Sequence, residues 1–359
     1  MTYKPDQPFN DLPLLPPERK LWETMEVYKQ LSIARAALAE LKGRAPIIPN
    51  PLMLINTLVL QEAKDSSSIE NIFTTSDKLY RAFASSTIEP DKQTKEVVRY
   101  RQALWDGWQK VQSEGLSLKV IEDIYRTIKE KDDGIRDTPV FVGTLKHVVY
   151  TPPCCKKVLT EKLKNWLEFA NAEDGVDPLI KMALMHYQFE AIHPFIDGNG
   201  RTGRVLNVLY ISLKNLLDQP ILYLSKYIND NRNEYYRLLN YVTANDSFEE
   251  WLIFMLKGIS ETAQNTLQKV NAIHDLFIKT QEKVKTWLPG IYSYELLELL
   301  FNQPYCKIGF IVDAGIASRN TAGKYLSELE KAGILVMEKS GHEFLYLNKG
   351  LFDILSGSR

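Results

Sequence analysis

The chain has 359 residues, of which 45% are hydrophobic and 25% are charged, and its formal net charge is −1. A chain of this length and composition forms two or three globular domains with a large core. The balance of charges excludes a basic field over the whole chain, of the kind that attracts nucleic acid or anionic lipid.

The first residues, MTYKPDQPF, lack the basic and apolar regions of a signal peptide, and no apolar stretch is long enough to cross a bilayer. The three cysteines are the adjacent pair Cys154 and Cys155 and the distant Cys306. This distribution is typical of reduced thiols rather than of a disulfide framework. The sequence therefore predicts a cytoplasmic protein without a membrane partner.

Helical patterns dominate the N-terminal region, residues 1–110. Apolar residues recur with the 3.6-residue period of a helix in KLWETMEVYKQLSIARAALAELKG and in PLMLINTLVLQEA. Just after the second segment, residues 66–71 read SSSIEN. Ser66 and Glu70 are four residues apart and would share one face of a helix. Ser67 and Glu70 also have capping-box spacing, so the start of an ordinary helix is the alternative interpretation.

A single hairpin signal interrupts the helical pattern. Residues 142–150, VGTLKHVVY, alternate in character, contain a glycine and stand between Pro139 and the pair Pro152 and Pro153. This pattern predicts a β-hairpin. Its first part comprises Val142, Gly143, Thr144 and Leu145.

The segment HPFIDGNGRTGR, residues 193–204, combines several groups that suit phosphate chemistry. The glycines allow backbone N–H groups to approach an anion, and the following apolar run, VLNVLYISL, predicts a helix whose N-terminus favours negative charge. Arg201 and Arg204 would share a helix face, and their guanidinium groups suit bidentate phosphate contacts. Asp197 offers an oxygen ligand for Mg²⁺, and His193 can take up a proton near neutral pH.

This segment resembles the signature of the Fic (Fido) family, HPFx[DE]GNGRxxR, at every defined position. The resemblance implies a fold that is mainly α, a helical array with one β-hairpin flap, and transfer of AMP from ATP to a protein hydroxyl. Under it, His193 is the general base, Asp197 holds Mg²⁺, and Arg201 and Arg204 bind the β- and γ-phosphate ends of the nucleotide. The implied ATP-binding set on this segment is Gly198, Asn199, Gly200, Arg201, Thr202, Gly203 and Arg204.

The resemblance extends to three other segments. The hairpin corresponds to the family's flap, which aligns the target segment by strand-like main-chain pairing. SSSIEN resembles the inhibitory motif [ST]xxxE[GN], which implies inhibitory roles for Ser66, Glu70 and Asn71. Glu70 would pair with Arg204 and occupy the space of the γ-phosphate. LSKYINDNRNEYYRLL resembles the segment over the adenine, so the candidate contacts are Tyr235, Tyr236 and Asn229.

The predicted Fic core covers residues 111–262 and a connecting helix covers 263–289. After Pro289 and Gly290, three helical patterns and two short apolar strands resemble a small α+β winged helix-turn-helix domain, residues 290–359. Arg319, Asn320 and Lys324 would begin its recognition helix. From Pro289 onward, however, seven basic residues face eight acidic ones, which is not the footprint of a phosphate binder. DNA, a docked protein and a second copy of the chain in a homodimer all stay open as partners of this domain.

The function expected from the sequence is a Mg²⁺- and ATP-dependent protein adenylyltransferase, restrained by Glu70, that modifies Ser, Thr or Tyr hydroxyls of an unidentified protein or of itself. Two alternatives stay open. One is a winged-helix DNA-binding transcriptional regulator whose core senses nucleotide. The other is a de-AMPylating enzyme, because removal of AMP would use the same residues.

Overall fold

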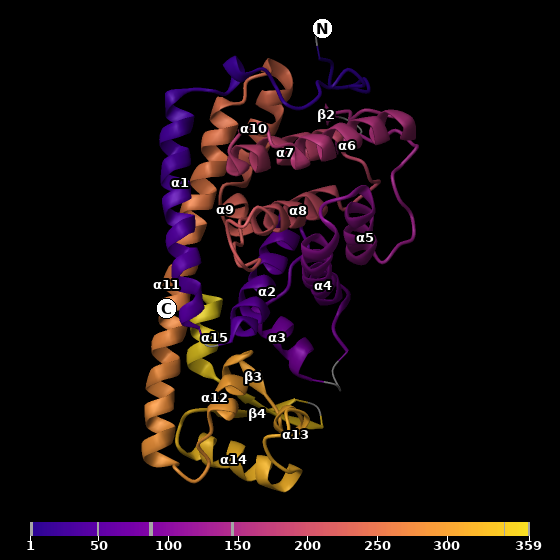
Figure 1. Ribbon diagram of the computed structural model, residues 1–359. Coiled ribbons are helices and arrows are strands. Elements are labelled where there is room, and N and C mark those ends of the chain that lie inside the picture. Colours follow the sequence, from indigo (N-terminus) through magenta and orange to yellow (C-terminus); the bar gives the residue numbers. More distant parts are fainter. Residues whose placement is uncertain (1–2, 49, 86–88, 145–146, 341, 358–359) are drawn as a thin grey trace.

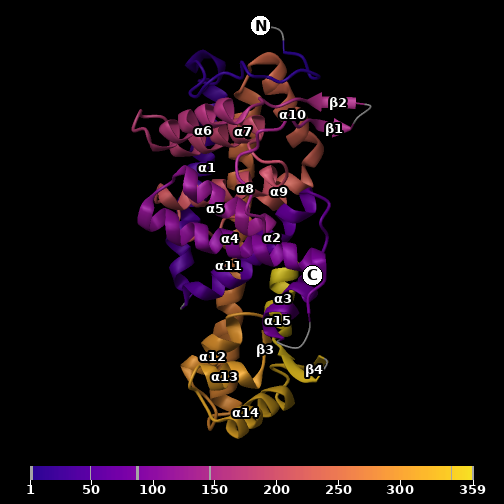
Figure 2. The same ribbon diagram turned by 90° about the vertical axis from the view of Figure 1, so that its right-hand side faces the viewer.

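The computed structural model describes residues 3–48, 50–85, 89–144, 147–340 and 342–357. Most of this part of the chain is helical, with one two-stranded and one three-stranded antiparallel sheet (Figures 1 and 2), so the expected mainly α fold is confirmed. The N-terminal region holds η1 (Arg19–Leu21), α1 (Met25–Arg44), η2 (Ala45–Ile47), α2 (Pro51–Ile69), α3 (Ser76–Ala84) and α4 (Lys92–Glu114).

The middle of the chain forms the bulk of the helical array. Its elements are α5 (Leu118–Lys129), β1 (Val142–Thr144), β2 (His147–Tyr150), α6 (Lys156–Asn171), α7 (Pro178–Ile192), α8 (Asn199–Leu213), α9 (Ser225–Asp230), α10 (Arg232–Asn245) and α11 (Glu249–Trp287). Helix α8 lies against α4, α5 and α7, which places the segment from residue 193 onward at the centre of the array (Figure 1).

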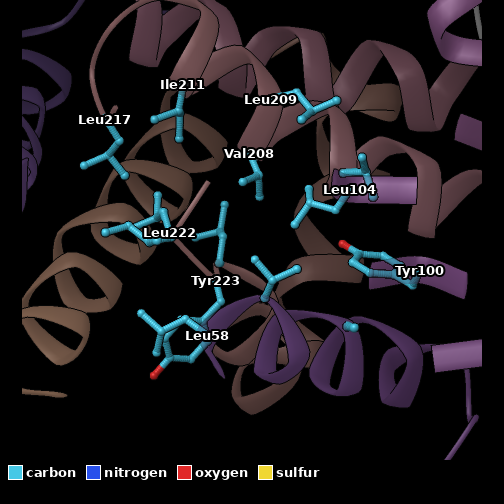
Figure 3. Close-up of a cluster of buried hydrophobic side chains, with 14 of the residues drawn as sticks. Leu58, Tyr100, Leu104, Val208, Leu209, Ile211, Leu217, Leu222 and Tyr223 are labelled. Carbon is cyan, nitrogen blue, oxygen red and sulfur yellow. The ribbon is translucent and has the colours of Figure 1, made fainter. Parts of the chain in front are cut away.

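The core beneath α8 is formed by helices from both halves of the array. Leu58 of α2, Leu104 of α4 and Leu209 of α8 are buried and belong to one apolar cluster (Figure 3). A Cβ on Gly107 of α4 would lie 2.9 Å from Leu209 Cδ1, so the absence of a side chain there lets α4 and α8 approach closely. Because α2 and α8 share this core, the SSSIEN segment lies beside α8.

Helices α1 and α11 run side by side along one edge of the molecule (Figure 1). Thr24 Oγ1 donates to Glu249 Oε1 where both helices begin, and Arg44 Nε donates to Asn271 Oδ1 further along, so the two helices are parallel. Helix α11 has 39 residues and a length of roughly 58 Å. It continues without a break through residues 262 and 263, the expected boundary between the core and the connecting helix.

The C-terminal part contains α12 (Tyr294–Phe301), β3 (Tyr305–Cys306), α13 (Ile308–Asp313), α14 (Arg319–Lys331), β4 (Val336–Ser340), β5 (Glu343–Leu347) and α15 (Lys349–Ser356). Three helices therefore precede an antiparallel hairpin, in the expected order. Strand β3 extends the sheet to the order β3-β5-β4, and α15 returns to pack on α11 and α2 (Figure 1).

This C-terminal part contacts α3, the helix that follows the SSSIEN segment. Tyr305 Oη donates to Asp77 Oδ1 at 2.6 Å, and Arg81 pairs with both Asp77 and Glu338. The Arg81 guanidinium also lies 4.8 Å from the centre of the Tyr305 ring. Among the described residues, no helix combines the length and apolar character needed to span a membrane.

Candidate active site

The turn between α7 and α8 is fixed by its own backbone and by Asn199. His193 ends α7 in the left-handed region, with φ 49°, and Gly198 precedes α8 with φ 83°. Between them, Phe195 N donates to Asn199 Oδ1 and Asn199 Nδ2 donates back to Phe195 O, both at 2.8 Å. Both polar atoms of the Asn199 side chain are thus bound within the turn. At this position, only the backbone N–H could contact an anion.

Arg136 binds the same turn and is not among the residues predicted from the sequence. It is buried, its Nε donates to His193 O at 2.8 Å, and its Nη2 donates to Pro153 O at 2.7 Å. Its backbone N–H donates to Pro194 O. A single arginine in the loop before the hairpin has no sequence signal that would link it to a histidine 57 residues away.

The His193 imidazole is half-buried beside the flap, and its Nδ1 lies 3.3 Å from Glu190 O. Burial lowers the pKa of His193 to about 4, because the charged imidazolium would lose its hydration. The ring is therefore neutral at pH 7, which is the form that accepts a proton.

Arg204 is buried on α8 and is bound by the SSSIEN segment. Its Nη2 donates to Glu70 Oε1 at 2.8 Å and to Ser66 O at 2.9 Å, while its Nε donates to Ser66 Oγ at 2.8 Å. The Glu70 carboxylate also lies against the start of α8, since a Cβ on Gly200 would be only 2.5 Å from its Oε1. This carboxylate therefore occupies the space where the helix N-terminus and Arg204 together would attract an anion.

Asn71, the last residue of the expected inhibitory set, lies further from this contact. It adopts φ 59°, and its Oδ1 accepts from Arg232 Nη1 at 3.2 Å. Asparagine is one of the few residues that adopt the left-handed region readily, so Asn71 turns the chain between α2 and α3.

A cavity of about 360 Å³ lies between the flap, the end of α7, the start of α8 and α10. Of the predicted site residues, it is lined by Glu70, Val142, His193, Gly200, Arg204, Tyr235 and Tyr236. Its wall does not include Ser66, Asn71, Gly143, Thr144, Asp197, Gly198, Asn199, Arg201, Thr202, Gly203 or Asn229. Segments that are far apart in the sequence thus meet around one cavity. The remaining predicted residues are not part of its wall.

Asp197, the expected Mg²⁺ ligand, forms an ion pair with Lys129 Nζ, and its Oδ1 accepts from Gly198 N at 2.6 Å. Burial alone would raise the pKa of Asp197, but the Lys129 ammonium and the hydrogen bonds more than offset this and hold the pKa below its usual value. A deprotonated, two-thirds exposed carboxylate suits Mg²⁺, which binds one or two carboxylates together with substrate phosphates. The residues present therefore fit the ion once Lys129 moves aside.

Arg201 is buried, and its Nη1 pairs with Glu96 Oε2 of α4 at 3.1 Å. The side chain thus points toward α4, although its charge still contributes to the low pKa of Asp197. Thr202 is buried, and Gly203 lies against α7. A Cβ on Gly203 would be 2.5 Å from Glu190 Oε1 of that helix. Gly203 consequently permits the close approach of α7 and α8.

The three expected adenine contacts differ in position. Tyr236 lines the cavity and is 38% exposed, whereas Tyr235 is buried and its Oη is hydrogen-bonded to His186 Nε2 at 2.9 Å. Asn229 is half-buried on α9, outside the cavity wall. Burial lowers the pKa of His186 to about 3, so that histidine is a neutral packing residue.

Glu190 is a further cavity residue that the sequence analysis did not single out. Burial raises its pKa to about 8, since its Oε1 lies against Gly203 without a hydrogen-bond partner among the described residues. The carboxyl is consequently protonated at pH 7. Glu190 lies three positions before His193, and apart from its place in the helical pattern nothing in the sequence predicts that it belongs to the site.

The hairpin of β1 and β2 forms one wall of the cavity. Val142 faces Tyr150 and Thr144 faces His147, with an irregularity after Val142. Gly143 has φ 119°, and a Cβ there would collide with His147 O. Among the described residues, strand β1 pairs with β2 alone and is exposed, so its outer edge could accept another strand. The expected flap residue Leu145 lies outside the described residues.

Sequence comparisons agree with this architecture. Residues 28–109 match the N-terminal region of the Fic/DOC family, residues 115–211 match the Fic/DOC family itself, and residues 276–351 match the C-terminal domain of SoFic-like protein adenylyltransferases. The chain belongs to the Fic/DOC family.

Two curated relatives are similar over part of their length. Protein adenylyltransferase fic-1 of Caenorhabditis elegans is 40% identical over 74 residues, which is 20% of this chain and 13% of that protein. A probable protein adenylyltransferase of Aquifex aeolicus is 30% identical over 135 residues, 38% of this chain and 41% of that protein. The matched part thus spans less than half the length of either relative.

A solved structure shares the fold over most of the chain. The Fic family protein from Desulfovibrio desulfuricans superposes with a TM-score of 0.55 at 18% identity, covering 90% of this chain and 96% of that one. This likeness extends the shared fold beyond the segments that match in sequence.

Proposed function

We propose that this protein is an adenylyltransferase that moves AMP from ATP to a hydroxyl of a protein side chain and releases pyrophosphate. The observation that carries the proposal is one cavity lined by a neutral histidine, by the N-terminus of α8 at Gly200, and by a buried arginine, Arg204. The names of the relatives, protein adenylyltransferases, support the same reaction.

In the proposed reaction, His193 takes the proton of the attacking Ser, Thr or Tyr hydroxyl. The hydroxyl oxygen forms a bond to the α-phosphorus of ATP, and the bond from that phosphorus to the bridging oxygen of pyrophosphate breaks. Burial suits His193 to this role, because its low pKa keeps the acceptor nitrogen free at neutral pH. Arg136 is a positioning residue, since it fixes the backbone of His193 through its carbonyl.

The phosphates would lie along the start of α8. Backbone N–H groups at Asn199 and Gly200 and the guanidinium of Arg204 would supply positive charge there, whereas the Gly198 N–H is already bound to Asp197. Asp197 would hold Mg²⁺, which when bound neutralises phosphate charge. Arg201 would contribute its positive charge without contacting the phosphates, because its guanidinium pairs with Glu96 of α4.

Glu70 would restrain this activity. Its carboxylate pairs with Arg204 and lies against Gly200, so a nucleotide whose terminal phosphate needs Arg204 must compete with it. Removing the carboxylate leaves a buried arginine free to bind phosphate. The exposed edge of β1 supports a strand-like target segment beside His193.

The test compares wild type, Glu70→Gly and His193→Ala, each incubated with Mg²⁺ and with ATP labelled at either the α- or the γ-phosphate. We expect protein label from α-labelled ATP alone, at least about tenfold stronger in Glu70→Gly and absent in His193→Ala. Glu261→Gln, which removes an exposed carboxylate of α11, is the matched control and should label like wild type.

Other outcomes contradict the proposal in different ways. Label from γ-labelled ATP would indicate transfer of phosphate rather than of AMP. If no variant incorporates label, but wild type removes AMP from a protein modified in advance, the enzyme works in the reverse direction. If His193→Ala labels as well as Glu70→Gly, His193 is not the base.

A further inference from the structure

A second cavity, of about 730 Å³, shares no lining residue with the candidate active site. Its walls come from α2, from Tyr223 and Lys226 around the start of α9, from the middle of α11, and from α15. Helix α15 therefore closes a space on the Fic core with the last described residues of the chain. A space of this size accommodates a small metabolite.

Three lysines from three helices converge on this cavity. They are Lys64 of α2, Lys226 of α9 and Lys269 of α11. Lys226 pairs with Asp230 at 2.8 Å, whereas Lys64 has a hydroxyl, Ser76 Oγ, at 3.2 Å. Among the described residues, Lys269 Nζ has no carboxylate within 4.0 Å and no hydrogen-bond acceptor; it lies 4.7 Å from the centre of the Tyr223 ring, and Asp65 is the nearest acidic influence on it.

Two acidic residues, Asp65 and Asp353, also line the cavity. Asp353 is paired with Lys349 at 3.1 Å, and Asp65 forms no ion pair within 4.0 Å among the described residues, although its charge interacts with all three lysines. Burial lowers the pKa of the Lys269 ammonium to about 8; the nearby Asp65 carboxylate opposes this shift, and the charges of Lys226 and Lys64 add to it. Burying a charged amine without a partner is unfavourable, and a bound anion would remove that cost.

We infer that this cavity binds a small phosphorylated molecule that also carries hydroxyl groups. Lys64, Lys226 and Lys269 would surround the phosphate, which accepts several charge-assisted hydrogen bonds at once. Asp65 and the amides of Asn265 and Gln268, which line the same space, would bind the hydroxyl groups. The site is separate from the ATP site and does not depend on the proposed transfer reaction.

The test is competitive acetylation of the full chain with acetic anhydride at pH 8, read lysine by lysine by mass spectrometry. The probe is ribose 5-phosphate, and its two halves, inorganic phosphate and ribose, are added in parallel. A phosphate beside Lys269 raises its pKa and covers it, so we expect acetylation of Lys269 to fall about tenfold with ribose 5-phosphate and to stay unchanged with ribose. Lys257, exposed on the same helix, should react equally in all samples.

Variants give a second readout by equilibrium binding of the probe. Lys269→Gln should weaken binding about tenfold, the loss expected for one charged hydrogen bond to the phosphate, while Lys257→Gln should bind like wild type. Unchanged acetylation of Lys269 at millimolar ribose 5-phosphate overturns the inference, as does equal binding by wild type and Lys269→Gln. Protection by ribose alone overturns the requirement for phosphate.

Discussion

Glu70 Oε1 accepts a hydrogen bond from Arg204 Nη2 at 2.8 Å and lies 2.5 Å from the point where a Cβ on Gly200 would stand. The absence of a side chain at Gly200 thus leaves the space that the carboxylate fills. Ser66 adds two acceptors to the same guanidinium, one from its hydroxyl and one from its carbonyl. Arg204 is consequently oriented by α2 even where Glu70 is removed.

Ser66→Ala tests this orientation. The change removes one acceptor from a buried guanidinium, so we expect a loss of about 1–3 kcal/mol in the free energy of unfolding, measured by denaturant titration. The matched control is Ser67→Ala, because the buried Ser67 hydroxyl has no hydrogen-bond partner among the described residues. Ser67→Ala should be close to neutral, and equal losses in the two variants would contradict the role of Ser66.

Arg136→Lys tests the positioning of His193. Lysine keeps the charge but cannot reach His193 O and Pro153 O with the two arms of a guanidinium. We expect kcat for AMP transfer to fall about 10- to 100-fold while the KM for ATP changes little, since the phosphate-binding groups stay in place. Arg35→Lys, which alters an arginine paired with Asp177 away from the cavity, is the control. A change in KM alone would assign Arg136 to nucleotide binding instead.

Gly143→Ala tests the flap. At φ 119°, an added Cβ collides with His147 O and distorts β1, so we expect transfer to a protein target to fall at least about tenfold while ATP affinity is retained. Gly175→Ala introduces a side chain at a comparable left-handed position, φ 77°, where nothing lies within 4 Å. That control should keep wild-type transfer. Normal transfer by Gly143→Ala, in a folded protein, would show that the flap does not align the target.

The sequence predicts those site residues that lie close together along the chain and misses those that join the site through tertiary contacts. The turn, the start of α8 and Arg204 lie within residues 193–204, so a local pattern predicts that they are close together. Arg136 and Lys129 join the site through tertiary contacts, and an isolated basic residue in a loop or at a helix end looks like any other surface charge. The burial of Tyr235 against His186 likewise depends on how α7 and α10 pack, which periodicity does not specify.

Lys129→Met tests whether Asp197 holds Mg²⁺. The ion pair with Lys129 competes for the carboxylate, so its removal should lower the Mg²⁺ concentration at half-saturation about three- to tenfold. Binding of Mg²⁺ with ATP, followed by calorimetry, measures this without turnover. Asp197→Asn should raise the same concentration. If Lys129→Met and wild type need equal Mg²⁺, the metal lies elsewhere.

Glu190→Gln tests the protonated carboxyl in the cavity wall. The folded-state pKa of Glu190, about 8, is above its ordinary value of 4.5, so its contribution to stability is complete below pH 4.5 and is lost as the pH rises through 8. Each proton released on unfolding changes the free energy of unfolding by about 1.4 kcal/mol per pH unit. Wild type should therefore lose stability relative to Glu190→Gln between pH 5 and 8, because glutamine stays neutral throughout. Parallel curves from denaturant titrations at these pH values would mean that Glu190 is ionised in the folded protein, held in that form by the nearby charge of Arg204.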